Sequence, residues 1–391
     1  MNEETRKFIS EHVDDNIHQL SLQSARFPLV DMPLAIRQIN GKQKIKSKIP
    51  FFFQQNDILY PVQLSLEQSS SESTAKYKSS LCEGKTLTDL TGGFGIDCYF
   101  LAHRFEQVSY IERNAELCEI AEHNFKVLGQ KNIDVFNTES ELFISEMSPV
   151  DWIFIDPARR NESGKKVVFL SDCEPDVSTL SSLLLDKSDK VMIKLSPMLD
   201  ISAAVRELPD TSEIHIISVD NECKEVLLIL TLNAGNNKKI RTINISRNKP
   251  DQVFEFYSED ETNTNATYTS SLEKFLYEPN ASVMKSGAFK LIGNNFNLSK
   301  IHFNTHLYTS PELSLEFPGR IFEVQKVWGS SKLELKELAD NTPKANISTR
   351  NFPLSVDNLR KKLKIKEGGD VYLFACTLSD ERKVIVECRK A

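Results

Sequence analysis

Residues 85–97 read KTLTDLTGGFGID, a short apolar strand that runs into a glycine-rich turn and then into a helix. In an open α/β sheet, ligands bind at the carboxyl ends of such strands. Gly93 and Gly95 allow a tight turn and let the backbone approach a bound group without an intervening Cβ. The turn lacks the Lys-Ser/Thr ending of a P-loop, and residue 98 is cysteine where the G-x-G-x-x-G pattern requires glycine. The turn therefore predicts a ligand site without naming the ligand.

Acidic residues surround the glycine-rich turn. Asp89 and Asp97 bracket it, and Glu112 ends the next predicted strand, 23 residues after Asp89. A carboxylate at that strand end can accept hydrogen bonds from both hydroxyls of a ribose. Negative charge disfavours a pyrophosphate and suits a sulfonium cofactor that carries an ammonium and no phosphate, so these acids favour S-adenosylmethionine over NAD. The residues expected to bind this cofactor are Asp89, Gly93, Gly95, Asp97 and Glu112.

Short apolar runs alternate with helical stretches from residue 85 to residue 232, which predicts a doubly wound α/β sheet. The last two predicted strands are joined by a tight turn at residues 221–222 and form a hairpin. Five βα units followed by a hairpin resemble class I methyltransferases, whose last strand inserts antiparallel. A dinucleotide-binding Rossmann domain would continue with parallel units instead. The seven predicted strands are residues 85–90, 107–112, 132–137, 151–157, 190–196, 213–220 and 225–232.

A second candidate loop follows the fourth predicted strand. Asp156, Pro157, Ala158, Arg159 and Arg160 come directly after the apolar run IFI. Proline fixes the backbone beside the acid, so the loop can place Asp156 against an incoming amine. The two arginines can bind a phosphate or stack on a base. An ordinary strand-end turn is the alternative, but the two preceding motifs favour substrate binding. The predicted catalytic residues are Asp156, Pro157 and Arg159.

Three further parts flank this Rossmann-like sheet, because a chain of 391 residues exceeds the ~250–300 at which single cores stop growing. Residues 1–80 show helical spacing of apolar side chains, with Gly41 as a helix cap and an extended piece at residues 50–61. The region after residue 233 opens with a polar gap and continues as two small α+β units. The predicted domains are residues 1–80, 82–235, 240–315 and 317–391.

Composition limits the remaining possibilities. The formal net charge of −7 gives no sign of nucleic-acid binding, yet residues 39–49 and 359–366 are basic, and each is either a solvated face or a phosphate-binding patch. No apolar run approaches the roughly 18–20 residues of a membrane span, and the acidic N-terminus is unlike a signal peptide. Seven cysteines without a C-x-x-C pair, and histidines without metal-ligand spacing, favour a cytoplasmic protein without a metal site.

The motifs resemble the class I S-adenosylmethionine-dependent methyltransferase superfamily over residues 82–235. The run from Asp89 to Asp97, followed by Glu112-Arg113-Asn114, is similar to bacterial small-subunit ribosomal RNA guanine-N2 methyltransferases. This resemblance implies a seven-stranded methyltransferase sheet. It also adds Thr91 and Arg113 to the expected cofactor-binding residues, together with Glu139, an acid after the third strand that would contact the adenine amino group.

The loop at Asp156 resembles the Asp/Asn-Pro-Pro-x loop of amino-methylating nucleic-acid enzymes. Ala158 replaces the second proline, and Arg159 replaces the aromatic residue that stacks adenine, so the resemblance disfavours adenine N6 as the acceptor. Methylation of a pyrimidine at C5 needs a cysteine nucleophile. Cys173 lies 17 residues past Asp156, but no cysteine follows the LSP of the fifth strand, and this chemistry is disfavoured.

Residues 276–391, with YEPNASVMKSGAFKLIG, FPGRIFEV and ISTRNFPLSVDNLRKKL, resemble the ferredoxin-like and THUMP-like tail of a bacterial methyltransferase family. THUMP domains generally handle RNA, so the tail implies tRNA or rRNA as the partner by analogy of fold. Oligomeric state is not indicated by any motif.

These observations predict in-line transfer of a methyl group from S-adenosylmethionine to an exocyclic amine of an RNA base, with guanine N2 favoured. Asp156 would orient the amine, Lys194 or Ser196 would line the pocket, and proximity would supply most of the barrier reduction. Two alternatives stay open. One is a small-molecule or protein methyltransferase on the same fold, and the other is a non-catalytic RNA-binding protein with a relict cofactor fold.

Overall fold

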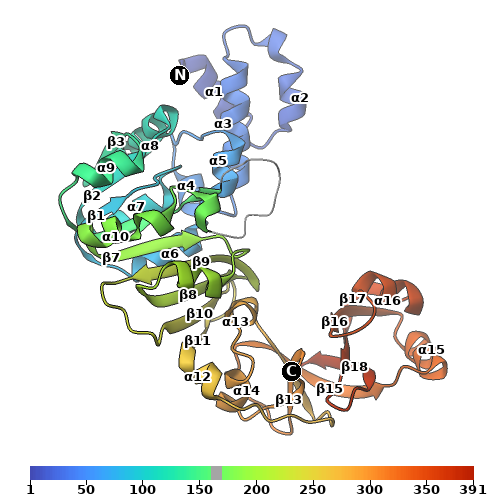
Figure 1. Ribbon diagram of the computed structural model, residues 1–391. Coiled ribbons are helices and arrows are strands. Elements are labelled where there is room, and N and C mark those ends of the chain that lie inside the picture. Colours follow the sequence, from blue (N-terminus) through green and yellow to red (C-terminus); the bar gives the residue numbers. More distant parts are fainter. Residues whose placement is uncertain (160–169) are drawn as a thin grey trace. The chain divides into compact units, whose positions relative to one another are not determined.

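Nine strands form one sheet in the order β11-β10-β8-β9-β7-β4-β1-β2-β3 in the computed structural model, which describes residues 1–159 and 170–391 (Figure 1). Strands β1 to β4 and β7 pair in parallel, and β9 pairs antiparallel with β7. The strands are β1 (Gly84–Asp89), β2 (Phe105–Glu112), β3 (Ile133–Asn137), β4 (Val150–Ile155), β7 (Ser188–Leu195), β8 (Thr211–Val219), β9 (Glu222–Leu230), β10 (Lys239–Ile245) and β11 (Gln252–Tyr257).

All seven predicted strands are present, and the antiparallel insertion of the last one confirms the methyltransferase-like strand order. The predicted number of strands was wrong, because β10 and β11 extend the sheet beyond β8. The sequence hid β10 because polar side chains occupy buried positions on it. Thr242, for example, is fully buried and donates a hydrogen bond to the carbonyl of Phe254 on β11 at 3.2 Å.

The parallel strands are apolar on both faces because helices cover them. Trp152, Ile153, Phe154 and Ile155 on β4 are consecutive and all buried. Asn or Asp side chains cap several of the covering helices, which explains where those helices begin. The helices are α7 (Ile96–Ala102), α8 (Ala115–Val127), α9 (Ser140–Glu146), α10 (Val177–Lys187) and α11 (Ile201–Glu207).

Six α-helices precede the sheet, and the last of them, α6, packs against α7. They are α1 (Glu3–Glu11), α2 (Ile17–Ser21), α3 (Met32–Ile45), α4 (Pro50–Gln54), α5 (Gln63–Gln68) and α6 (Glu72–Ser80). Residues 50–54 are helical rather than extended as predicted, because Pro50 suits the first turn of a helix. No helix within residues 1–159 and 170–391 is long and apolar enough to cross a bilayer.

Gly41 does not cap a helix as predicted but lies inside α3. A Cβ on Gly41 would be 2.3 Å from the Cβ of Tyr60, so the absence of a side chain lets Tyr60 pack onto the helix. Gln38, one turn earlier, pairs with the backbone N–H and carbonyl of Tyr60 at 2.8 and 2.9 Å. The glycine therefore marks a close packing contact.

The chain divides into two compact units, residues 1–213 with 226–236, and residues 214–225 with 237–391. The second unit contains a seven-stranded sheet in the order β13-β14-β12-β15-β18-β17-β16. Its strands are β12 (Phe275–Pro279), β13 (Ser299–His302), β14 (Thr305–Ser310), β15 (Gly319–Trp328), β16 (Lys344–Arg350), β17 (Lys366–Thr377) and β18 (Lys383–Lys390). Its helices are α12 (Ser258–Asn263), α13 (Ala281–Ser286), α14 (Leu291–Asn295), α15 (Lys332–Asn341) and α16 (Val356–Leu363).

A buried carboxylate joins three strands of this second sheet. Glu278 on β12 pairs with Arg320 on β15, whose Nε is 2.7 Å away, and with Arg350 on β16, whose Nη2 is 2.6 Å away. Glu278 is nearly inaccessible to solvent, and a buried acid needs such partners. Helix α13 ends before α14 begins because Gly287 adopts φ 79°.

Gly41→Ala is expected to lower the free energy of unfolding, because the new methyl group must displace Tyr60 in a packed core, at a cost of about 1–3 kcal/mol. The gain in helix propensity of alanine over glycine offsets about 1 kcal/mol of this cost, which leaves a net loss of up to about 2 kcal/mol. Gly235→Ala is the matched control, because a Cβ there meets nothing within 4 Å. Urea unfolding of the full-length variants measures both effects, and equal midpoints for the two variants would contradict the packing role of Gly41.

Candidate functional site

Two aromatic rings shape the glycine-rich turn after β1. A Cβ built on Gly92 would lie 2.1 Å from the ring of Tyr110 on β2, so only glycine fits there. Gly95 adopts φ 82° at the start of α7, and a Cβ there would lie 2.9 Å from the ring of Phe125 on α8. Glycine at position 95 is therefore required by backbone conformation and packing.

The turn is open at Gly93. This residue adopts φ 55°, and a Cβ there would meet nothing closer than the carbonyl oxygen of Thr91 at 3.8 Å. The Gly93 N–H donates to Glu112 Oε2 at 2.9 Å, and the Asn114 N–H donates to Glu112 Oε1 at 2.8 Å. The acid that ends β2 is thus tied to the turn that follows β1, and these two predicted motifs form one site.

Asp89 is a buried acid with one unsatisfied oxygen. Its Oδ1 accepts a hydrogen bond from the Thr91 N–H at 3.0 Å, while its Oδ2 has no hydrogen-bond partner among the residues that the structure describes. Burial raises the pKa of this carboxyl well above its usual range, and the neighbouring acids Asp97, Asp156 and Glu112 raise it further. Such a group favours a ligand that brings a positive charge or a hydrogen-bond donor.

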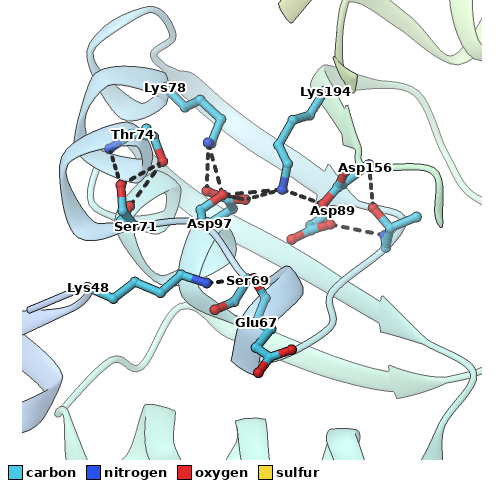
Figure 2. Close-up of polar contacts among 12 residues, drawn as sticks. Lys48, Glu67, Ser69, Ser71, Thr74, Lys78, Asp89, Asp97, Asp156 and Lys194 are labelled. Atoms are coloured by element: carbon cyan, nitrogen blue, oxygen red, sulfur yellow. Dashed lines mark hydrogen bonds and ion pairs between the residues drawn. The ribbon is translucent and has the colours of Figure 1, made fainter. Parts of the chain in front are cut away.

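Asp97 lies within a buried charge network (Figure 2). Its carboxylate is 3.2 Å from the Lys78 ammonium and 3.5 Å from the Lys194 ammonium, and it accepts a hydrogen bond from the Ser70 hydroxyl at 2.7 Å. Burial opposes its ionisation, but Lys78, Lys194 and Ser70 together lower its pKa. Asp97 therefore has protein partners for its charge, whereas Asp89 Oδ2 has none.

Asp156 occupies the end of β4, next to the glycine-rich turn. Its backbone N–H donates to Thr91 Oγ1 at 2.6 Å, and its carboxylate pairs with Lys194. The side chain is 34% exposed, against 10% for Asp97, so this acid is the more accessible of the two. Burial raises the pKa of Asp156 although Lys194 opposes that effect. A raised pKa makes a carboxylate a better proton acceptor.

The loop after Asp156 begins and ends in a short pair of strands. Pro157 is buried, and β5 (Ala158–Arg159) pairs antiparallel with β6 (Cys173–Glu174). Arg113 contacts Glu174 through two nitrogens at 3.0 and 3.3 Å, so this predicted cofactor-binding residue is paired with the far end of the loop after Asp156. Arg160 and the side chain of Arg159 lie outside the described part of the chain.

Hydrogen bonds and ion pairs join most of the predicted site residues, but Glu139 and Arg113 lie outside this set. Glu139 is exposed before α9 and makes no side-chain capping bond, although the neighbouring Ser140 hydroxyl donates to the Leu90 carbonyl at 2.6 Å. Arg113 is exposed and paired with an acid. The residues linked by hydrogen bonds or ion pairs around the turn are Asp89, Thr91, Gly93, Asp97, Glu112 and Asp156.

Lys78 and Ser70 were not predicted from the sequence. They come from the N-terminal helical segment, and no local pattern distinguishes a buried lysine from the exposed lysines around it.

Within the described residues, no group of three or more His, Cys, Asp or Glu side chains could hold a metal ion. Of the predicted basic segment 39–49, Lys44 pairs with Glu67 and Lys48 donates to the carbonyls of Leu66 and Glu67, so part of it serves the fold.

Comparison with known proteins shows which families and solved structures this chain is similar to. Residues 275–318 match a ferredoxin-like domain family, and residues 319–390 match a THUMP domain-like family. No curated protein sequence matches the chain. A crystal structure of a "putative methyltransferase" from Porphyromonas gingivalis W83 is 34% identical, with a TM-score of 0.90, and the alignment covers 99% of this chain and 97% of that one.

The chain belongs to the family of the Porphyromonas gingivalis protein. The family match confirms the methyltransferase-like α/β fold with C-terminal ferredoxin-like and THUMP-like parts. Two other solved structures share less. One is from Listeria monocytogenes and is described as a "putative class i s-adenosylmethionine-dependent methyltransferase". It is 9% identical over 62% of this chain and 94% of its own, with a TM-score of 0.39. A Streptococcus mutans protein in complex with SAH, likewise called a putative methyltransferase, is 13% identical over 41% and 97%, with a TM-score of 0.31.

Asp89→Asn is expected to stabilise the ligand-free protein more at pH 8 than at pH 5, by a few degrees of melting temperature. The pKa of Asp89 is raised, so the folded protein retains a proton that the unfolded chain releases, and the fold loses stability as the pH rises above the usual carboxyl range. Asparagine removes that loss because it carries no charge. Thermal unfolding at both pH values tests this, with the exposed Asp186→Asn as control, and a gain that does not depend on pH would contradict it.

Proposed function

We propose that this protein transfers a methyl group from S-adenosylmethionine to an exocyclic amine of an RNA base, with guanine N2 as the favoured acceptor. One observation carries the proposal. A buried carboxylate oxygen without a described partner, Asp89 Oδ2, lies at the turn whose open position is Gly93, and the accessible Asp156 is hydrogen-bonded to the same turn. This arrangement suits a cationic cofactor beside an acceptor amine.

The residues around the turn fit S-adenosylmethionine. Asp89 Oδ2 would accept a hydrogen bond from the cofactor's ammonium, which would also supply the positive charge that this buried acid lacks. The open side of Gly93 gives the cofactor access to the turn. Glu112 accepts one backbone hydrogen bond on each oxygen and keeps lone pairs for ribose hydroxyls. A pyrophosphate would meet Asp89, Asp97 and Asp156 with like charge, which supports the sulfonium cofactor over a dinucleotide.

When bound, S-adenosylmethionine supplies a methyl group on a sulfonium, and Asp156 receives the acceptor amine. The Asp156 carboxylate accepts a hydrogen bond from an amine N–H, which directs the nitrogen lone pair at the methyl carbon. As the new N–C bond forms, the bond between the methyl group and sulfur would break and release a neutral thioether. The acceptor nitrogen would become cationic and would have to lose one proton. Asp156 takes that proton, and Lys194 stabilises the carboxylate before transfer. Holding the amine and the methyl group in line at attack distance would supply most of the reduction of the activation barrier.

The THUMP-like segment supports RNA as the substrate class. Residues 319–390 contain 15 lysines and arginines against 10 aspartates and glutamates, in a chain whose net charge is −7. Helix α16 buries Leu359 and Leu363, and it exposes Lys361 and Lys362. Exposed lysines at the end of α16 and at the starts of β16 and β17 extend this basic surface, which we define as Lys344, Lys361, Lys362, Lys364 and Lys366.

The basic surface is electrostatically unfavourable for the isolated protein. Lys344 on β16 is the register partner of Lys366 on β17, and like charges directly opposite one another destabilise a sheet. Within the described residues, none of its five lysines forms an ion pair. A polyanion would relieve this repulsion, and the phosphate backbone of RNA supplies one.

Asp156→Asn tests the catalytic role. We expect methyl transfer to fall by at least about a hundredfold, because asparagine cannot take the proton, while S-adenosylmethionine affinity measured by isothermal titration stays close to that of the wild type. Nucleoside mass spectrometry of tRNA and rRNA from a strain that lacks the gene identifies the acceptor. Asp186→Asn on α10, which is exposed, is the matched control. Undiminished turnover in Asp156→Asn would exclude this role, and a wild-type protein that binds no S-adenosylmethionine would favour the relict alternative.

Reversing two charges of the basic surface tests the RNA partner. Lys361→Glu with Lys362→Glu is expected to weaken binding of an RNA hairpin by at least about tenfold at 50 mM salt and to flatten the salt dependence of log Kd, because fewer counterions are released. Lys332→Glu with Lys336→Glu on α15 is the matched control with the same change of charge. Fluorescence anisotropy across a salt series measures both. Equal losses in the two double variants would show that net charge, rather than this surface, governs binding.

A further inference from the structure

Lys78 is a fully buried cation from the N-terminal helical segment, and Figure 2 shows Asp97 between it and Lys194. The Lys78 Nζ is 3.2 Å from Asp97 Oδ1, and the Lys194 Nζ is 3.5 Å from Asp97 Oδ2. Lys194 also pairs with Asp156. Four charges therefore alternate in sign, from α6 through α7 and β7 to the loop after β4.

Ser70 holds the two lysines in place. Its hydroxyl donates to Asp97 Oδ2 at 2.7 Å and accepts from the ammonium groups of Lys78 and Lys194 at 3.1 and 3.2 Å. A hydroxyl has one proton and two lone pairs, so these three bonds use its full capacity. Lys48 steadies the preceding helix α5 by donating to two carbonyls near its end.

Lys194 lies between two carboxylates that compete for it. The Asp97 side chain is 10% exposed and the Asp156 side chain 34%, so water compensates Asp156 better than Asp97. Leaving a buried charge unpaired costs more than leaving an accessible one. If Asp97 had no other cation, Lys194 would shift toward Asp97 and away from Asp156. Lys78 supplies that other cation.

We propose that Lys78 is a positioning residue of the methyl-transfer site, because it compensates Asp97 and thereby leaves Lys194 to hold Asp156 where the acceptor amine binds. The inference rests on the proposed function and extends the active site to the N-terminal helices. Among the described residues, the charged groups around Asp156 are Lys194 from β7, Asp97 from α7, Asp89 from β1 and, beyond Asp97, Lys78 from α6. Burial raises the pKa of Asp156, Lys194 lowers it, Asp97 raises it and Lys78 lowers it.

Lys78→Met removes the buried charge at a similar side-chain volume. We expect Asp156 to titrate at higher pH, measured by carbon-13 NMR of carboxyl-labelled, ligand-free, full-length protein. The acidic limb of the pH–rate profile should move up with it, and methyl transfer at neutral pH should fall about tenfold to a hundredfold, as is typical of a misplaced catalytic group. The KM for S-adenosylmethionine should stay unchanged. A wild-type titration curve and rate in folded Lys78→Met would overturn the proposal.

The double variant Lys78→Met with Asp97→Asn separates positioning from a structural role. It removes the competing carboxylate together with its cation, so Lys194 should return to Asp156. The Asp156 titration of the ligand-free double variant should recover toward that of the wild type. A folded double variant whose Asp156 titration stays as displaced as in Lys78→Met would overturn the proposal.

Ser70→Ala keeps every charge and covers the case in which Lys78→Met does not fold. Loss of the hydroxyl removes the hydrogen bond that Asp97 Oδ2 accepts from Ser70, so Lys194 should be drawn toward Asp97. The Asp156 titration should therefore move in the same direction by a smaller amount, and an unchanged titration would count against the proposal. The NMR titration needs no methyl acceptor. A wild-type protein that transfers no methyl group therefore refutes the proposed function, while the titrations still decide whether Lys78 positions Asp156.

Discussion

Burying a carboxylate costs free energy unless a cation or a hydrogen-bond donor compensates it, and this constraint organises the candidate site. Asp97 and Asp156 receive their compensation from Lys78 and Lys194. Asp89 receives one backbone hydrogen bond and keeps one unsatisfied oxygen. The two compensated acids fix the architecture of the sheet edge, and the third leaves the folded protein with an electrostatic preference for a cationic ligand. A site in which every acid was paired would be more stable and would bind a cationic ligand less strongly.

The same constraint connects the helical segment to the sheet. Lys78 is buried because α6 packs against α7, which carries Asp97, and Ser70 lies in the turn between α5 and α6. The helices therefore contribute charge as well as apolar contact to the first unit. This explains why the fully buried Lys78 is tolerated, since Asp97 and Ser70 supply the polar contacts that water would otherwise provide.

The sequence was informative at the three motifs of the candidate site, whose causes are local. A strand followed by glycines, an acid at the end of the next strand and an Asp-Pro loop each depend on a few neighbouring residues, and all lie where they were predicted. Lys78 was missed because its role depends on a carboxylate in another helix, and Gly41 was misread because Tyr60 decides its packing. Strand β10 was missed because buried polar residues such as Thr242 interrupt its apolar pattern. For Arg113 the partner is Glu174, 61 residues away, which no spacing rule identifies.

The ferredoxin-like and THUMP-like families meet between residues 318 and 319, and that boundary falls between hydrogen-bonded strands. Strand β12 belongs to the first and pairs with β15 of the second, while Glu278 on β12 binds Arg320 and Arg350 across the boundary. A gene rearrangement that separated the two parts would leave an unpaired edge on β12 and on β15. It would also leave the buried Glu278 carboxylate without its two arginine partners. We therefore expect the ferredoxin-like and THUMP-like parts to be inherited together, as one unit of domain rearrangement.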